Sequence, residues 1–223
     1  MLPWTKLATA PIPGGDELRL MRRGDEFSIR LGANELMNSR LGGSEEALAT
    51  LACKKLDGRS RPRVLIGGLG MGFTLRAALA VFGDDAAIEV AELVPEVIDW
   101  GRGEMAGLFG DSLTDPRVSL VARDVGELIR DGAGRYDAIL LDVDNGPEGL
   151  SRKANDRLYD AAGLAATRAA LRGAGVLALW SSGPDDAFTR RLRQSGFAVN
   201  EVPVRAVGKR GGSRHWIWLA VRG

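Results

Sequence analysis

Two hydrophobic patterns divide the chain near residue 43. In the first part, short runs in which apolar and polar residues alternate are separated by Arg23-Gly24-Asp25 and Gly32-Ala33-Asn34. Alternation with a period of two is typical of half-buried strands, and glycine beside Asp or Asn favours tight turns. Residues 1–42 are therefore predicted to form a small N-terminal β-hairpin extension or meander, packed on the main domain because two or three short strands rarely stand alone.

From residue 43 onward, short apolar runs alternate with longer helical segments. The predicted strands are Val64–Ile66, Ile88–Leu93, Val118–Ala122, Tyr136–Val143, Val176–Trp180, Phe197–Val207 and His215–Val221. The predicted helices cover residues 44–56, 74–82, 95–108, 125–130, 157–171 and 188–194. Strands that alternate with helices form a parallel sheet covered on both faces, whereas the last two strands, which have no helix between them, must be antiparallel. Residues 43–223 are thus predicted to form an α/β domain: a class I methyltransferase Rossmann-like seven-stranded sheet with an antiparallel C-terminal hairpin.

Composition narrows the functional classes. The 223 residues are 45% hydrophobic and 26% charged, which is ordinary for a globular protein with a sizeable core. A net charge of +1 gives no general attraction to nucleic acid or to a membrane surface. The single cysteine excludes an internal disulfide and a cysteine-based metal cluster, and no apolar stretch reaches the length of a signal peptide or a membrane span. We expect a cytoplasmic protein without a metal site.

Four glycines mark the turn after the first strand of the main domain: Gly67, Gly68, Gly70 and Gly72. Glycines between a strand and a helix permit a tight turn and let a ligand approach the backbone closely. A dinucleotide-binding fingerprint has its third glycine one position later, where this chain has Phe73. The spacing therefore disfavours NAD and favours a nucleoside without a pyrophosphate, S-adenosyl-L-methionine (AdoMet), although a glycine turn without a ligand is the alternative.

Two further residues at strand ends are candidates for binding that nucleoside. Glu92 ends the second strand of the main domain, where a carboxylate can accept hydrogen bonds from both ribose hydroxyls. Asp124 ends the third strand and can accept from an adenine amino group, while Val125 offers its backbone amide to the ring. Asp124 also suits the N-cap of the next helix, and the two roles are compatible.

The fourth strand ends in the candidate catalytic residues, Asp142 and Asp144. Ligands of open α/β sheets bind beyond the carboxyl ends of the strands, so both acids stand where a cofactor and an acceptor meet. Carboxylates there can bind a cationic amine, accept its proton or align it with the sulfonium carbon. Turn formation explains part of the following Asn145-Gly146-Pro147 sequence, but it explains Asp142 poorly, because Asp142 closes an otherwise apolar strand.

Two features near the C-terminus leave alternatives open. His215, the only histidine, suits a polar position on a strand face better than a catalytic base. The loop over residues 205–214 contains Arg205, Lys209, Arg210 and Arg214 without an acid. Such a run is usually a solvated hairpin, and the alternative is that it closes over an anionic or RNA acceptor.

Taken together, these residues resemble the spermidine synthase family and its methyltransferase-like relatives. The likeness runs from about Leu18 to Trp180. After the N-terminal hairpin its segments are Ser44-Glu45-Glu46-Ala47-Leu48, Val64-Leu65-Ile66-Gly67-Gly68, Glu92 with Val97-Ile98, Asp115-Pro116-Arg117-Val118, Asp124 and Tyr136-Asp137-Ala138-Ile139-Leu140-Leu141-Asp142. The resemblance implies a class I fold in which Glu92 and Asp124 hold the nucleoside and Asp142 is the catalytic carboxylate.

Three positions depart from the family's pattern. Gly70 stands where the family has an aspartate that contacts the amine of an aminopropyl group. Asp142-Val143-Asp144-Asn145-Gly146-Pro147 replaces a motif of Asp, two hydroxyl residues, Asp and Pro, and Gly43-Ser44-Glu45 replaces Tyr-His-Glu. The sequence therefore favours a spermidine-synthase-like AdoMet-dependent transferase that moves a methyl group to an unidentified small acceptor.

Two alternatives accompany this prediction. One is a polyamine aminopropyltransferase, a spermidine synthase that uses decarboxylated S-adenosylmethionine, and the other is a non-catalytic nucleoside-binding subunit. The expected partner is a small-molecule acceptor, with an amine among the candidates, rather than a nucleic acid or a membrane. A homodimer is left open.

Overall fold

The computed structural model describes residues 2–143, 156–207 and 211–223. Its first sheet is antiparallel, with the strand order β1-β2-β3-β4. The strands are β1 (Thr5–Pro11), β2 (Glu17–Arg23), β3 (Glu26–Leu31) and β4 (Asn34–Asn38). The predicted meander is confirmed, but β1 was missed, because this edge strand is mostly exposed and lacks the alternating pattern.

The main sheet has seven strands in the order β10-β11-β9-β8-β5-β6-β7. They are β5 (Arg63–Gly67), β6 (Ala87–Glu92), β7 (Val118–Ala122), β8 (Tyr136–Leu141), β9 (Leu171–Ser181), β10 (Phe197–Val207) and β11 (Gly211–Arg222). Strands β5 to β9 pair in parallel, whereas β11 is antiparallel to both β9 and β10. The predicted α/β sheet with an antiparallel C-terminal hairpin is confirmed.

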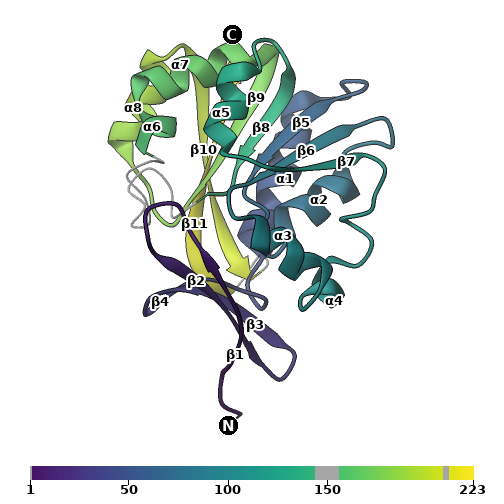
Figure 1. Ribbon diagram of the computed structural model, residues 1–223. Helices are drawn as coiled ribbons and strands as arrows, with labels where there is room; N and C mark the ends of the chain where they lie inside the picture. Colours follow the sequence, from purple (N-terminus) through teal and green to yellow (C-terminus); the bar gives the residue numbers. More distant parts are fainter. Residues whose placement is uncertain (1, 144–155, 208–210) are drawn as a thin grey trace.

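Helices cover both faces of the main sheet (Figure 1). They are α1 (Gly43–Leu56), α2 (Phe73–Val81), α3 (Pro95–Arg102), α4 (Ala106–Phe109), α5 (Val125–Asp131), α6 (Asp156–Tyr159), α7 (Ala161–Ala170) and α8 (Asp186–Gln194). Side chains of α1 to α4 share one hydrophobic core with the N-terminal sheet, and side chains of α5 to α8 form a second core on the opposite face. Among the described residues, no helix is both long enough and apolar enough to cross a bilayer.

Three predicted element boundaries differ from those of the structure. The helix predicted over 157–171 is two helices, because the Asp160 side chain accepts a hydrogen bond from the Gly163 amide at 2.7 Å and starts a new helix there. The helix predicted over 95–108 is likewise broken, between Arg102 and Ala106. The helix predicted over 44–56 begins one residue earlier, at Gly43, and Ser44 is buried in its first turn.

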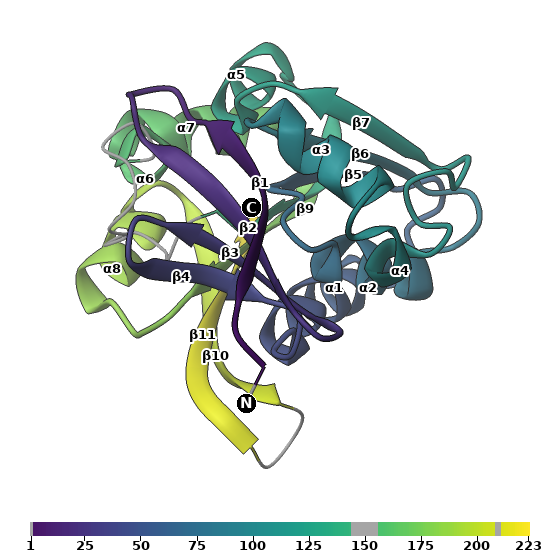
Figure 2. The ribbon, with the colours of Figure 1, turned by 60° about the horizontal axis from the view of Figure 1, so that its bottom comes forward.

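The N-terminal sheet lies across the edge of the main sheet at which the parallel strands end (Figures 1 and 2). Its inward-facing residues Leu18, Leu20 and Ile29 belong to the same core as Val94 and Val97 of the main domain. Carboxyl ends of parallel strands are where ligands of open α/β sheets bind. The N-terminal sheet therefore covers the region in which a ligand site is expected.

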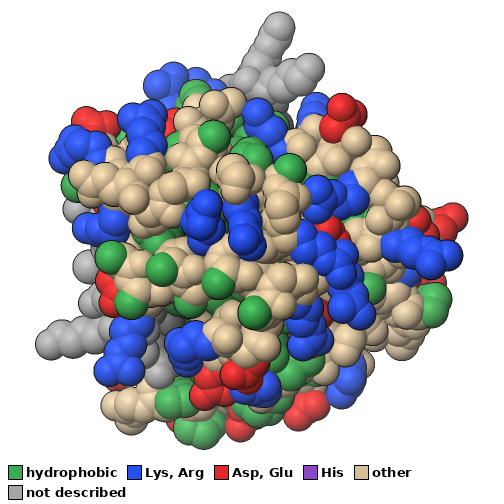
Figure 3. Space-filling model, turned by 90° about the horizontal axis from the view of Figure 1, so that it is seen from above, with side chains coloured by type: hydrophobic (Ala, Val, Ile, Leu, Met, Phe, Trp, Pro, Cys, Tyr) green, Lys and Arg blue, Asp and Glu red, His purple; other side chains and the backbone are tan. Residues whose placement is uncertain are grey.

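The opposite edge, where the parallel strands begin, is rich in arginine. Lys and Arg side chains gather on this face, with the Asp and Glu side chains mostly toward its margins (Figure 3). Beneath it Asp137, only 1% exposed, accepts from Arg59 Nη1 at 2.7 Å and from Arg172 Nη1 at 2.9 Å. The Arg63 amide donates to the same carboxylate at 2.8 Å. This cluster ties β5, β8 and β9 together at the edge that is farthest from the N-terminal sheet.

Candidate active site

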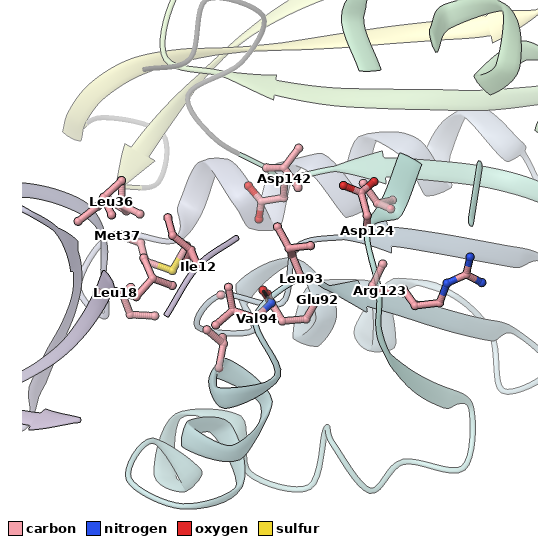
Figure 4. Close-up of a pocket in the computed structure, with 18 residues that line it drawn as sticks. Ile12, Leu18, Leu36, Met37, Glu92, Leu93, Val94, Arg123, Asp124 and Asp142 are labelled. Carbon is pink, nitrogen blue, oxygen red and sulfur yellow. Dashed lines mark hydrogen bonds between the residues drawn. The ribbon is translucent and has the colours of Figure 1, made fainter. Parts of the chain in front are cut away.

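A cavity of about 160 Å³ lies between the two sheets. Its lining residues on the N-terminal sheet and the loop after β1 are apolar: Ile12, Leu18, Ile29, Leu31, Leu36 and Met37. The lining from the main domain contains three acids, Glu92, Asp124 and Asp142. Figure 4 shows Ile12, Leu18, Leu36 and Met37 on one side of the cavity and the three acids on the other, with the Arg123 side chain pointing away. The cavity can thus surround an aromatic, uncharged group and present carboxylates to its polar atoms.

Glu92 lies at the end of β6 and is 9% exposed. Its two carboxylate oxygens accept from the Val94 amide at 3.0 Å and from the Leu69 amide at 2.9 Å, so the carboxylate is fixed against the glycine turn. Burial raises the pKa of Glu92, and the hydrogen bonds from backbone amides oppose that shift. The backbone amides of Gly70 and Leu93 act on the same carboxylate, which lines the cavity where a ribose diol would need an acceptor. The ribose-binding role remains a prediction.

The backbone of the glycine turn lines the cavity at Gly68 and Gly70. Gly68 has a φ of +90°, and a Cβ there would lie 2.5 Å from the Asp142 carbonyl oxygen. Gly70 has a φ of +51°, and a Cβ there would lie 2.7 Å from Cε and 2.8 Å from Sδ of Met37. The Met37 thioether of β4 therefore covers the position at which a side chain from residue 70 would project.

Asp124 precedes α5 and caps it, because its side chain accepts from the Gly126 amide at 2.7 Å. The capping role foreseen for Asp124 is confirmed. Asp124 and Val125 both line the cavity, and the Val125 amide is one of the first-turn amides that a helix leaves without an intrahelical acceptor. The adenine contacts of both residues remain predictions.

Asp142 follows β8 and lines the cavity at the topological switch point between β5 and β8. Its amide donates to the Gly67 carbonyl at 3.0 Å, and Thr74 Oγ1 donates to its Oδ2 at 2.7 Å. Burial, together with the negative charge of Glu45, raises the pKa of Asp142 to about 7, although the Thr74 hydrogen bond opposes this shift. Asp142 can therefore change its protonation state near neutral pH.

A hydrogen-bonded chain leads from Glu45 to the C-terminal strand. Ser44 Oγ donates to Glu45 Oε2 at 2.5 Å, and His215 Nδ1 lies 2.8 Å from the same hydroxyl oxygen. The His215 ring meets the Trp180 ring edge to face, with a centroid distance of 4.8 Å. Burial raises the pKa of Glu45 and lowers the pKa of His215. This network links α1, β9 and β11 beside Asp142.

The structure gathers most of the predicted site residues, but not all of them. Gly68, Gly70, Glu92, Asp124, Val125 and Asp142 line one cavity. Gly67 packs between Val125 and Leu141, and Gly72 is the N-cap of α2, so neither of these glycines lines the cavity. Asp144, Lys209 and Arg210 lie outside the described residues.

Sequence reasoning missed Met37, Thr74 and the link from His215 to Ser44. Met37 reaches the glycine turn from a different sheet, and His215 is 171 positions from Ser44, so no local pattern signals either contact. Thr74 carried a signal, since a hydroxyl residue in the first turn of α2 lies close to the end of β8. Within the described ranges, no group of three or more His, Cys, Asp or Glu residues is placed to hold a metal ion.

No protein-family model and no curated protein sequence match this chain. Solved structures do match it. A spermidine synthase from Thermotoga maritima gives a TM-score of 0.77 at 20% identity, over 98% of this chain and 73% of that one. A spermidine synthase in complex with the transition-state analogue AdoDATO gives 0.76 at 19% identity, over 98% and 72%. A probable spermidine synthase from Corynebacterium glutamicum gives 0.66 at 13% identity, over 97% and 79%. The chain therefore has the fold of spermidine synthases, as the resemblance implied.

Proposed function

We propose that this protein transfers an aminopropyl group from decarboxylated S-adenosylmethionine to a small amine. The observation that carries the proposal is the position of Asp142, a half-buried acid at the end of β8 that faces a mainly apolar cavity also lined by Glu92 and Asp124. The shared fold with spermidine synthases supports aminopropyl transfer better than the methyl transfer that the sequence favoured.

The residues around the cavity fit a sulfonium nucleoside. Glu92 would bind the ribose through a carboxylate that backbone amides fix in place, Gly68 leaves room beside the turn, and Asp124 and Val125 would contact the adenine. Leu18 and the other apolar side chains of the N-terminal sheet would cover the uncharged parts and exclude water. When bound, the nucleoside supplies an electrophilic carbon attached to a positively charged sulfur.

Asp142 binds the acceptor amine and takes its proton. An ammonium group has no free electron pair, so it must lose a proton before its nitrogen can act as a nucleophile. A general base works best when its pKa is near the working pH, and burial beside Glu45 brings Asp142 to about 7. Thr74 fixes the orientation of the carboxylate through its 2.7 Å hydrogen bond. The rest of the catalysis is positioning and exclusion of water.

Methyl transfer from intact AdoMet is the second candidate, and one observation favours it. The turn has no acid at Gly70, and Met37 fills the space above it, so no carboxylate there can bind the free ammonium of a decarboxylated donor. Such a charge-assisted hydrogen bond contributes about 1.5–3 kcal/mol. Its absence removes one means of preferring the decarboxylated donor over AdoMet.

A donor competition distinguishes these functions. The purified protein is incubated with butane-1,4-diamine and equal concentrations of AdoMet and decarboxylated AdoMet, and the products are identified by mass spectrometry. We expect 5′-methylthioadenosine and an aminopropylated amine, at a rate that falls by about two orders of magnitude in Asp142→Asn. S-adenosylhomocysteine and a methylated amine would instead establish methyl transfer. Nucleoside binding without turnover of either donor, tested also with an extract of small metabolites, would identify a binding subunit.

A further inference from the structure

The contacts around Ser44 fix the direction of its hydrogen bonds. A serine hydroxyl has one proton to donate, and an ionised carboxylate can only accept. With Glu45 ionised, Ser44 Oγ must therefore donate to Glu45 Oε2, over the observed 2.5 Å. The same oxygen then accepts from His215 Nδ1, 2.8 Å away, which requires the imidazole tautomer that carries its proton on Nδ1.

The network is anchored in the protein interior at Ser44, which is fully buried, whereas Glu45 and His215 are partly buried. The His215 ring also makes an edge-to-face contact with the Trp180 ring. Burial disfavours the ionised form of Glu45, and the hydrogen bond from Ser44 counteracts that effect. Without Ser44 and His215, the carboxylate of Glu45 would be free to rotate and would hold a proton more readily.

Glu45 is linked in turn to Asp142 through Thr74. Its negative charge bears on Asp142, and its backbone carbonyl lies 3.4 Å from Thr74 Oγ1, the hydroxyl that donates to Asp142. Two carboxylates that share one site bind a cation together more strongly than either would alone. An amine held by Asp142 therefore also experiences the charge of Glu45, provided that Glu45 stays ionised and oriented.

We propose that His215 is a positioning residue of the transfer site, which acts through Ser44 to hold the Glu45 carboxylate toward an ammonium group bound at Asp142. The inference rests on the proposed function, because it assumes an amine in that site. In this role the only histidine of the chain contributes to binding of the acceptor amine rather than to proton transfer.

Binding of butane-1,4-diamine in the presence of saturating 5′-methylthioadenosine tests this role, measured by calorimetry. His215→Leu removes the donor, whereas His215→Asn keeps an amide nitrogen near the position of Nδ1. We expect about a tenfold weaker diamine affinity for His215→Leu and recovery to within about threefold for His215→Asn. Glu45→Gln should weaken binding at least as much as His215→Leu. The control Glu104→Gln, at an exposed position outside the site, should stay within about twofold of the wild type.

The decisive measurement is the double variant. If His215 acts through Glu45, then His215→Leu has less than a twofold effect in the Glu45→Gln background, because the carboxylate to be positioned is already gone. A tenfold loss in both backgrounds would overturn the proposal. So would an unchanged diamine affinity in His215→Leu, or a parallel loss of nucleoside affinity, which a merely structural role would produce.

The wild type separates this inference from the proposed function. Binding of 5′-methylthioadenosine without any binding of the diamine would overturn the positioning role while leaving the nucleoside site intact. Failure to bind the nucleoside would overturn the proposed function and, with it, the role of His215.

Discussion

Asp142 is the residue whose protonation state depends most directly on its surroundings in the fold. It closes a fully buried strand, and its carboxyl group faces both a cavity and the charge of Glu45. Water solvates such a group poorly, so the neutral form is favoured in the folded protein. The same environment that adjusts Asp142 for proton transfer therefore makes its ionised form destabilising.

Replacing Asp142 by Asn should consequently stabilise the folded protein at alkaline pH. The pKa of Asp142 rises from 3.8 in the unfolded chain to about 7 in the folded protein, so its contribution to stability is complete below 3.8 and is lost as the pH rises through 7. Each pH unit in this window changes the free energy of unfolding by at most about 1.4 kcal/mol. The full window corresponds to about 4 kcal/mol, and because the half-buried carboxyl group is partly screened by solvent, we expect about half of it. Asp142→Asn should therefore gain on the order of 2 kcal/mol over the wild type as the pH rises from 4 to 8, measured by urea unfolding. A constant difference between these pH values would contradict a raised pKa.

Residues of the site differ in how far the sequence could predict them. Glu92, Asp124 and Asp142 were predicted because each ends a strand, and parallel strands bring their carboxyl ends to one edge. Met37 and His215 could not be predicted, since their positions depend on how two distant segments pack against the main sheet. Contacts of that kind are set by tertiary packing rather than by local sequence pattern.

Elements were predicted best where burial is complete. Strand β8 is buried at every position, and its continuous apolar run predicts a strand at these residues. Strand β1 was missed because most of its residues are exposed, and the break between α6 and α7 was missed because one capping side chain decides it. Apolar patterns report burial, so they locate core elements and pass over edges and caps.

At this scale Asp137 should be the main polar contributor to stability. It is buried and binds two arginines and one backbone amide, so Asp137→Ala would leave these donors without their acceptor. We expect a loss of about 3 kcal/mol in the free energy of unfolding, near the lower end of the range for breaking a buried pair, because Arg59 and Arg172 are partly exposed and can be rehydrated.

Asp131→Ala is the matched control, because the Asp131 side chain is 64% exposed and pairs with Arg123 at the surface. Such a pair contributes no more than about 1 kcal/mol. Chemical denaturation of both variants should show a large shift in the midpoint for Asp137→Ala only, with nucleoside affinity unchanged in each. Equal shifts of the midpoint in both variants would show that the Asp137 cluster contributes no more to stability than a surface ion pair does.

For the whole molecule, the position of the cavity between two sheets has a thermodynamic consequence. A nucleoside that contacts Met37 on one sheet and Glu92 on the other binds only when both sheets are in place. At a hundred times its Kd, 5′-methylthioadenosine should therefore raise the free energy of unfolding by about 2.7 kcal/mol. Trypsin cleavage after Arg23, at the turn between β2 and β3, should slow in parallel. Thermal stabilisation without protection of this turn would place the nucleoside on the main sheet alone.

The N-terminal sheet also has a consequence for synthesis in the cell. Its four strands are joined by short turns, so they can pair as soon as they leave the ribosome, yet most of the core that Leu20 and Ile29 share is made of residues synthesised later. The end of β4 and the end of β8 are about a hundred residues apart. At about 5–20 residues per second, roughly 5–20 seconds pass before the central strands of the main sheet, on which this apolar face packs, are all made. A nascent chain of this protein thus exposes an apolar surface on its N-terminal sheet early in translation. Molecular chaperones have their longest opportunity to bind this surface during that interval.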